Sequence, residues 1–149
     1  MDIGIIGQGF VGNAVYQKFK KYYNVKTYDL QSMLSNATEQ EVLDNDVVFI
    51  CLPTPMNKDG SCYIDIVEAA IKRVFEFGVA KTVVIKSTVP PGTTSKWNEQ
   101  FPSLDVIFNP EFLTEANAVS DYENQTRIIL GGPRKSTTKL KPIFAKVFP

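Results

Sequence analysis

Strand-like and helix-like patterns of apolar residues alternate along the 149-residue chain. Short runs rich in Val and Ile predict about six strands, because buried parallel strands read as nearly continuous apolar segments. Between them, apolar residues recur at helical spacing and predict amphipathic helices. Strands that alternate with helical crossovers predict a parallel sheet. The predicted strands are 3–6, 25–29, 47–52, 81–86, 106–108 and 126–130.

Local start signals support several of the helices. Thr38 and Glu41 form the pattern of a capping box and predict a short helix that ends near residues 44–46. Leu140, Ile143, Phe144 and Val147 lie on one face of a predicted terminal helix over 136–148. Further helices are predicted from about Phe10, from a cap near Asp65, from Trp97 to about Phe101 with Thr93 or Thr94 as the cap, and around Glu115 and Ala116.

Three glycines, Gly7, Gly9 and Gly12, follow the first predicted strand and open the first helix. In this spacing the first makes a tight turn, the second lets the backbone approach a pyrophosphate, and the third lets the helix pack on the strand. The helix start suits a diphosphate because its N–H groups are unpaired and its dipole is positive there. Asp29 ends the second predicted strand about 20 residues later, where an acid can bind a ribose hydroxyl and repel a 2′-phosphate, favouring NAD over NADP. The alternative is a glycine turn of another α/β protein, with Asp29 an ordinary strand-end residue.

Together these signals predict a doubly wound parallel sheet of the Rossmann type, a three-layer αβα fold with about six strands. In such a sheet, ligands bind at the carboxyl ends of the strands. Besides the glycine turn, the unusual loops of the sequence follow predicted strands at 53–55, 87–92 and 109–113. We therefore expect four loops to converge on one crevice.

Composition narrows the function classes. The 16 basic residues balance the 16 acidic ones, and neither a nucleic-acid partner nor a membrane span is expected. The chain has no histidine, which removes Ser-His and Cys-His dyads, and Cys51 and Cys62 lack metal-ligand spacing, so no metal site is predicted. Met1 leads into the first strand without a signal-peptide pattern, which predicts a cytoplasmic protein. We expect residues 1–149 to form one domain.

Three longer motifs go beyond the fold class. The first comprises residues 52–55 together with 59–61, the second residues 86–93 and the third residues 109–115. In this order and spacing, the three motifs resemble those of the UDP-glucose/GDP-mannose dehydrogenase family. The resemblance covers the NAD-binding domain of that family, whose members oxidise the 6-hydroxyl of a nucleotide sugar twice, through a thiohemiacetal, with NAD. The central helix of that family, with its Lys and Asn, and the C-terminal domain, with its nucleophilic Cys, have no counterpart in the 149 residues.

The resemblance therefore implies a truncated or split dehydrogenase that is inactive alone and is completed by a partner chain. The alternative is a non-catalytic nucleotide-binding or interaction module.

The resemblance also implies roles for individual residues. Thr88 would position a catalytic water, Glu111 would be the acid–base residue, and Glu115 would lie near the nicotinamide, in line with the carboxylates that alcohol oxidation needs. Residues 111–115 would face the sugar: Glu111, Phe112, Leu113, Thr114 and Glu115. The cofactor-binding set would be Gly7, Gln8, Gly9, Phe10, Val11, Gly12, Asp29, Leu52, Pro53, Thr54, Pro55, Ser87, Thr88, Val89 and Glu115.

Structural alternatives exist for several of these residues. Glu111 and Glu115 lie four apart and are also compatible with solvated charges at a helix start. Arg127 is expected in a structural ion pair. Two positions depart from the family pattern, because Leu34 stands where the family has a basic residue and Ala116 where it usually has glycine.

Overall fold

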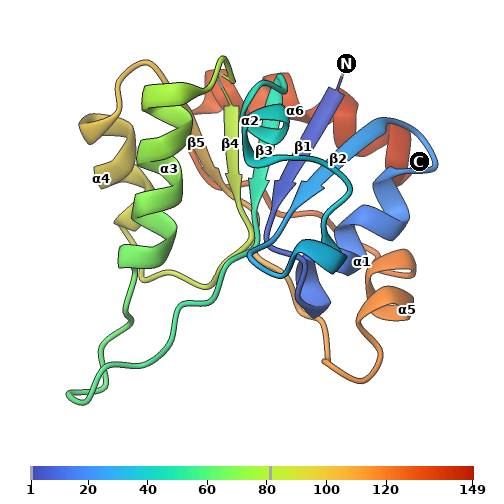
Figure 1. Cartoon of the computed structure of the whole chain (residues 1–149), viewed down its shortest axis with the longest axis horizontal. Helices are drawn as coiled ribbons and strands as arrows, with labels where there is room; N and C mark the ends of the chain where they lie inside the picture. Colours follow the sequence, from blue (N-terminus) through green and yellow to red (C-terminus); the bar gives the residue numbers. More distant parts are fainter. Residues whose placement is uncertain (1, 81) are drawn as a thin grey trace.

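Five parallel strands form one sheet in the computed structural model, which describes residues 2–80 and 82–149 (Figure 1). Their order is β2-β1-β3-β4-β5, one of the two common doubly wound arrangements, with its switch point between β1 and β3. The predicted Rossmann-type fold is confirmed. The strands are β1 (Asp2–Ile6), β2 (Asn24–Tyr28), β3 (Val47–Ile50), β4 (Thr82–Ile85) and β5 (Asp105–Phe108).

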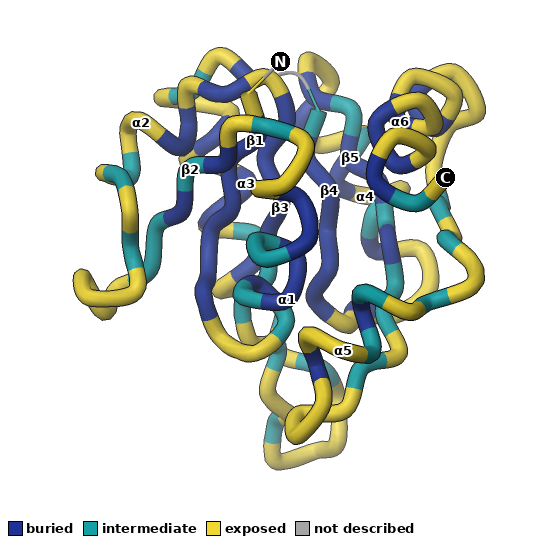
Figure 2. Tube along the Cα trace, turned by 90° about the vertical axis from the view of Figure 1, so that its right-hand side faces the viewer, coloured by how far each residue is buried: buried dark blue, intermediate teal, exposed yellow. Residues whose placement is uncertain are grey.

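Helices cover both faces of the sheet, because successive strand residues point to opposite sides. Ile3 and Ile5 pack in the cluster of α1, α5 and α6, whereas Ile6 packs in the cluster of α2, α3 and α4. Figure 2 shows the strands as the buried centre and the outer helix faces as exposed. The helices are α1 (Phe10–Phe19), α2 (Glu39–Leu43), α3 (Asp65–Phe77), α4 (Thr93–Gln100), α5 (Ala118–Glu123) and α6 (Arg134–Val147), with a 3-10 turn at Ser32–Leu34.

The short crossover through α2 forms as the sequence predicts. The Thr38 hydroxyl accepts the Glu41 N–H and the Glu41 carboxylate accepts the Thr38 N–H, which completes the capping box. The helix lies close to the sheet at Gly4, where a Cβ would lie 2.6 Å from the Val42 carbonyl oxygen. A larger residue at position 4 would therefore push α2 away from the first strand.

The predicted sixth strand at 126–130 is wrong. Beyond β5 the chain makes only an isolated antiparallel bridge, in which Phe108 and Gly131 exchange two backbone hydrogen bonds of 2.8 and 2.7 Å. Ile128 and Leu130 do pack against the core. A short apolar run predicts that a segment is buried, but it does not distinguish a strand from an irregular segment.

The predicted helix around Glu115 and Ala116 is also wrong, because α5 begins only at Ala118. Side chains compete for the backbone N–H groups here: the Glu111 carboxylate takes that of Leu113, and the Asp121 carboxylate takes that of Thr114.

Other helix and strand ends differ by a few residues from the predicted ones. The cap of α4 is Gly92, with φ +86°, rather than Thr93 or Thr94, and the cap of α3 is Ile64. Among the strands, β3 ends at Ile50, before Cys51 and Leu52. The predicted start of the fourth strand at Lys81 lies outside the described residues.

Candidate functional site

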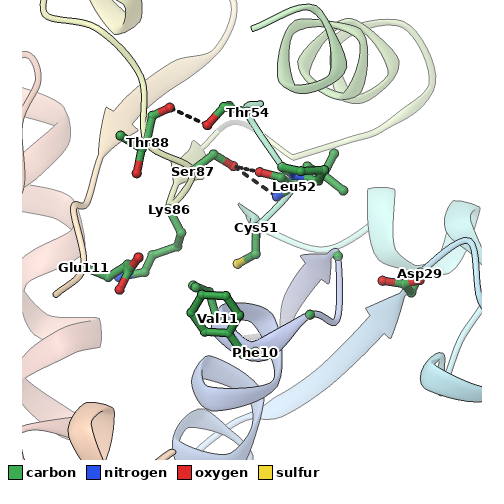
Figure 3. Close-up of a pocket in the computed structure, with 13 residues that line it drawn as sticks. Phe10, Val11, Asp29, Cys51, Leu52, Thr54, Lys86, Ser87, Thr88 and Glu111 are labelled. Carbon is green, nitrogen blue, oxygen red and sulfur yellow. Dashed lines mark hydrogen bonds between the residues drawn. The ribbon is translucent and has the colours of Figure 1, made fainter. Parts of the chain in front are cut away.

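A crevice of about 440 Å³ opens at the carboxyl end of the sheet (Figure 3). Every strand contributes to it, because the chain after each parallel strand emerges at this edge. In Figure 1 these segments meet below the arrowheads of the strands. The lining residues are Gly7, Gly9, Phe10, Val11, Asp29, Cys51, Leu52, Pro53, Thr54, Lys86, Ser87, Thr88 and Glu111.

The three glycines of the turn differ in what surrounds them. Gly7 has φ +97°, and a Cβ there would lie 2.5 Å from the Cys51 carbonyl oxygen. A Cβ on Gly12 would lie 1.9 Å from the Gly7 carbonyl oxygen, so this position packs helix on turn. A Cβ on Gly9 would meet nothing within 4 Å. Since Gly9 also precedes α1 without a side-chain cap, the turn leaves open space at a helix start.

Asp29 is tied to this turn. Its carboxylate accepts the N–H of Gln8 at 2.7 Å and that of Gln31 at 2.9 Å. These bonds join the carboxyl end of β2 to the glycine turn and fix a half-buried carboxylate at one end of the crevice.

A second, mostly apolar cavity of about 200 Å³ adjoins the crevice and shares Gly7, Asp29 and Leu52 with it. Its other walls come from β1, β2, α2 and α3, so no local motif marks it in the sequence. This slot was not predicted from the sequence. Its further lining residues are Ile6, Tyr28, Leu30, Glu39, Leu43, Ile66, Ala69, Ala70 and Arg73.

Hydrogen bonds join the loops after β3 and β4 into one wall. The Ser87 hydroxyl donates to the Leu52 carbonyl at 2.6 Å and accepts the Leu52 N–H at 3.0 Å. The Thr54 hydroxyl donates to the Thr88 carbonyl at 2.7 Å. Ser87 is buried, and its hydroxyl links the two loops. The Thr88 side chain is instead exposed to the crevice.

Lys86 is a site residue that sequence analysis did not single out. It is only 3 % exposed, and its Nζ donates to the Asn109 side-chain oxygen at 2.9 Å. Burial lowers the pKa of Lys86 to about 8, against the opposing influence of Cys51 and Glu111. Burial also raises the pKa of the neighbouring Cys51 thiol to about 12. The available signal was a lysine at the end of an otherwise apolar strand.

The loop after β5 divides its residues between the crevice and other hollows. Glu111 lines the crevice. The Leu113 N–H donates a hydrogen bond to the Glu111 Oε2 at 2.6 Å, which fixes the Glu111 side chain. Glu115 instead lines a separate hollow beside Lys21, and Phe112 and Thr114 line a third, with Arg127. Among the described residues Arg127 forms no ion pair, so its expected structural pairing is not found.

Most of the residues predicted to bind the cofactor line the crevice. Gly12, Pro55 and Val89 do not; Gly12 packs under the turn and Val89 is buried in the core. Gln8 lines a neighbouring hollow and bonds Gly7 through its side chain. Cys51 and Lys86 line the crevice without having been predicted.

Two functional features are absent from the described ranges 2–80 and 82–149. Within them, no three His, Cys, Asp or Glu side chains are grouped so as to hold a metal ion. None of the helices in these ranges combines the length and apolar character needed to cross a membrane.

Comparison with known proteins identifies what the chain resembles. The sequence profile of the UDP-glucose/GDP-mannose dehydrogenase family, NAD binding domain, matches residues 18–148. UDP-glucose 6-dehydrogenase of Streptococcus pneumoniae is 30 % identical over 165 residues, which cover 88 % of this chain and 41 % of that protein. The chain thus spans less than half the length of this relative.

Solved structures agree on the fold. GDP-mannose dehydrogenase from Pseudomonas aeruginosa superposes with a TM-score of 0.80 at 24 % identity, covering 98 % of this chain and 44 % of that one. UDP-D-ManNAc dehydrogenase from Pyrococcus horikoshii gives a TM-score of 0.83 at 23 % identity, over 99 % of this chain and 45 % of that one.

Proposed function

The chain belongs to the UDP-glucose/GDP-mannose dehydrogenase family as its NAD-binding domain, and from this premise we propose that it forms the cofactor half of a nucleotide-sugar 6-dehydrogenase. The observation that carries the proposal is the open space at Gly9, between a helix start and the Asp29 carboxylate. The glycine turn lies outside the matched range 18–148, so it supports the assignment independently.

The residues of the crevice fit the parts of NAD. The α1 start at Gly9 suits the diphosphate, and Asp29 suits a ribose 2′-hydroxyl. The apolar slot that shares Asp29 with the crevice suits the adenine ring. The remaining walls, at Thr54, Thr88 and Glu111, are left for the nicotinamide half.

When bound, NAD supplies a hydride acceptor. Glu111 serves as the base that takes the proton of the sugar hydroxyl, and Thr88 orients a water molecule for the hydrolytic step. Residues 112–115 provide backbone and side-chain contacts for the nucleotide sugar, and Glu115 is assigned to the nicotinamide side of the cofactor. Because Glu115 lies outside the crevice, its assignment requires the loop after β5 to move.

The other half of the active site comes from residues beyond these 149, in the same polypeptide or in a partner chain. The sugar-binding wall and the nucleophilic thiol belong to this other half. Within the crevice, Cys51 is unsuited to that task because its raised pKa, about 12, keeps the thiol protonated at neutral pH.

Calorimetric titration with NAD and NADP tests the cofactor assignment. We expect NAD to bind at least about tenfold more tightly, because the Asp29 carboxylate repels a 2′-phosphate. Asp29→Asn should narrow this difference, whereas the control Asp46→Asn, an exposed acid at the opposite end of the sheet, should preserve it. Equal affinities in the unmodified chain would remove Asp29 from the ribose role, and no binding of either dinucleotide would refute the proposed function.

A further inference from the structure

We propose that Lys86 makes the crevice bind NADH more tightly than NAD⁺, because it fixes a buried positive charge in the wall that faces the nicotinamide half. The inference rests on the proposed function, since it requires the dinucleotide to occupy this crevice. It assigns to Lys86 a role in selecting the redox state of the cofactor rather than a chemical step.

The position of Lys86 follows from the sheet. It comes directly after β4, two strands away from β1 and its glycine turn, and it lines the same crevice. With the diphosphate at Gly9 and a ribose at Asp29, the second nucleotide must extend toward β4 and β5. In Figure 3 the Lys86 side chain reaches from the strand end toward Glu111, between the wall at Ser87 and the start of α1 at Val11.

The Lys86 ammonium is held in place from two sides. Its acceptor, Asn109, is 1 % exposed and donates in turn to the Ile129 carbonyl at 2.8 Å. The Tyr122 ring lies on another side, with its centroid 5.3 Å from Nζ. An ammonium so enclosed cannot turn into solvent, so its field acts on whatever occupies the crevice.

This charge is only partly neutralised. An amide oxygen and an aromatic face carry partial negative charge, and Lys86 forms no ion pair with any residue in 2–80 or 82–149. Glu111 is the acid that lies near it in the crevice, and its carboxylate has the opposite effect on a cationic ring. However, Glu111 is half-buried and accepts the Leu113 N–H, so solvent and this hydrogen bond both weaken the field of its carboxylate. The Lys86 ammonium is more deeply buried, so its field is screened less.

The two redox states of the cofactor differ by one positive charge on the nicotinamide ring. A fixed ammonium therefore penalises NAD⁺ and leaves the neutral ring of NADH unaffected. At an effective dielectric of about 20, two unit charges about 12 Å apart give roughly a tenfold preference. Tighter binding of the reduced form makes the bound cofactor a stronger hydride acceptor, which favours oxidation of an alcohol.

The preference should depend on pH through Lys86 itself. Burial places the pKa of Lys86 at about 8, so the ammonium loses its charge as the pH rises through that value. Among the described residues, the titratable groups that face it are Cys51 from the β3 end, Glu111 from the β5 loop and Tyr122 from α5. The pKa of Cys51 is raised to about 12 and that of Tyr122 is raised above its ordinary value, so both stay uncharged in this range.

The test measures the dissociation constants of NAD⁺ and NADH for the 149-residue chain at about pH 6.5 and about pH 9. We expect the preference for NADH to be roughly tenfold at the lower pH and to shrink severalfold at the higher pH. Lys86→Met should abolish the pH dependence. Lys86→Arg should retain the preference at both pH values, because a guanidinium does not lose its proton there.

A matched control is Lys18→Met, since Lys18 is also a buried lysine but pairs with Glu123 at 2.9 Å outside the crevice. It should leave both affinities unchanged. A preference for NADH that is independent of pH, or one that survives Lys86→Met, would overturn the inference while leaving the NAD site intact. Failure of the unmodified chain to bind either dinucleotide would instead refute the proposed function. Thermal unfolding of each variant checks that the fold is retained.

Discussion

At the scale of single residues, the glycine turn shows that similar residues in one motif have different physical tasks. Gly12 is required by packing, because a Cβ there would lie 1.9 Å from a carbonyl oxygen. Gly7 is required by conformation, with φ +97°. Neither packing nor conformation requires glycine at position 9, because its φ is −67° and the space around a Cβ is open. The proposed diphosphate gives a reason for the smallest side chain at this position that neither packing nor conformation supplies.

Replacing Gly9 by Val should therefore abolish NAD binding without unfolding the protein. The new methyl groups would fill the approach path of the diphosphate, while the backbone conformation suits any residue. Calorimetry with NAD and thermal unfolding measure the two effects separately.

Gly131→Ala is the control, because a Cβ there meets its nearest neighbours at an ordinary 3.7 Å. That variant should keep both affinity and stability. Gly12→Ala should instead lose stability. Undiminished NAD affinity in Gly9→Val would make the turn purely structural.

At the scale of elements, each edge strand is closed by an asparagine side chain. On β5, Asn98 accepts the Val106 N–H and donates to the Val106 carbonyl, both at 2.8 Å. On β2, Asn36 accepts the Thr27 N–H at 2.8 Å and donates to the Val25 carbonyl at 3.1 Å. These amides occupy backbone groups that an open edge would offer to another chain. The edges therefore need no further strand.

We predict that Asn98→Ala lowers the free energy of unfolding by about 1–3 kcal/mol, because it leaves two backbone groups of β5 without partners. It should also promote self-association through the exposed edge. Urea unfolding and light scattering measure the two consequences.

Asn24→Ala provides the comparison, since Asn24 is exposed and its side-chain amide donates to the Asp2 carboxylate at a long 3.5 Å. Its effect should stay within about 0.5 kcal/mol. A similarly small effect of Asn98→Ala would show that water replaces the amide at this edge.

At the scale of the whole molecule, the parallel topology gathers groups distant in sequence into one crevice. Asp29, Lys86 and Glu111 come from the ends of β2, β4 and β5 and line the same cavity. The long loop from Cys51 to Ile64 projects beyond the sheet at this same edge (Figure 1). In the proposed function, the cofactor lies in this crevice and the nucleotide sugar binds beside it.

We predict that the 149-residue chain alone binds NAD but produces no NADH from UDP-glucose. Catalysis needs the sugar held against both the nicotinamide and Glu111, and loss of such positioning costs many powers of ten in rate. The Cys51 thiol cannot replace a nucleophile because its pKa is raised to about 12. The measurement is NADH absorbance with protein whose NAD binding has been verified.

Sustained NADH production, lost in Glu111→Gln, would contradict this prediction and show that a complete site assembles from these residues. Production that is unchanged in Glu111→Gln would point to a contaminating enzyme.

The sequence alone determined the features that depend on local spacing. The strand, glycine turn and helix at the amino end, the capping box of α2 and the alternation of strands and helices are set by neighbours in the chain, so periodicity predicts them. The loops at the strand ends could be assigned to one crevice because parallel strands share a carboxyl edge. The family resemblance rested on such contiguous motifs, and the profile match confirms it.

Only the tertiary structure decided the features made by distant segments. The run at 126–130 is apolar because it packs on the core, yet β5 receives an asparagine and a single bridge on its outer edge instead of a strand. Lys86 was unremarkable as a lysine at the end of a strand. Its pKa is lowered by burial, to which distant segments such as α5, with Tyr122, contribute. Glu115 was grouped with Glu111 by spacing, but the Asp121 and Glu111 carboxylates hold the loop out of a helix and separate the two acids. Burial and hydrogen-bond competition depend on which segments meet, and that is settled only when the whole chain has folded.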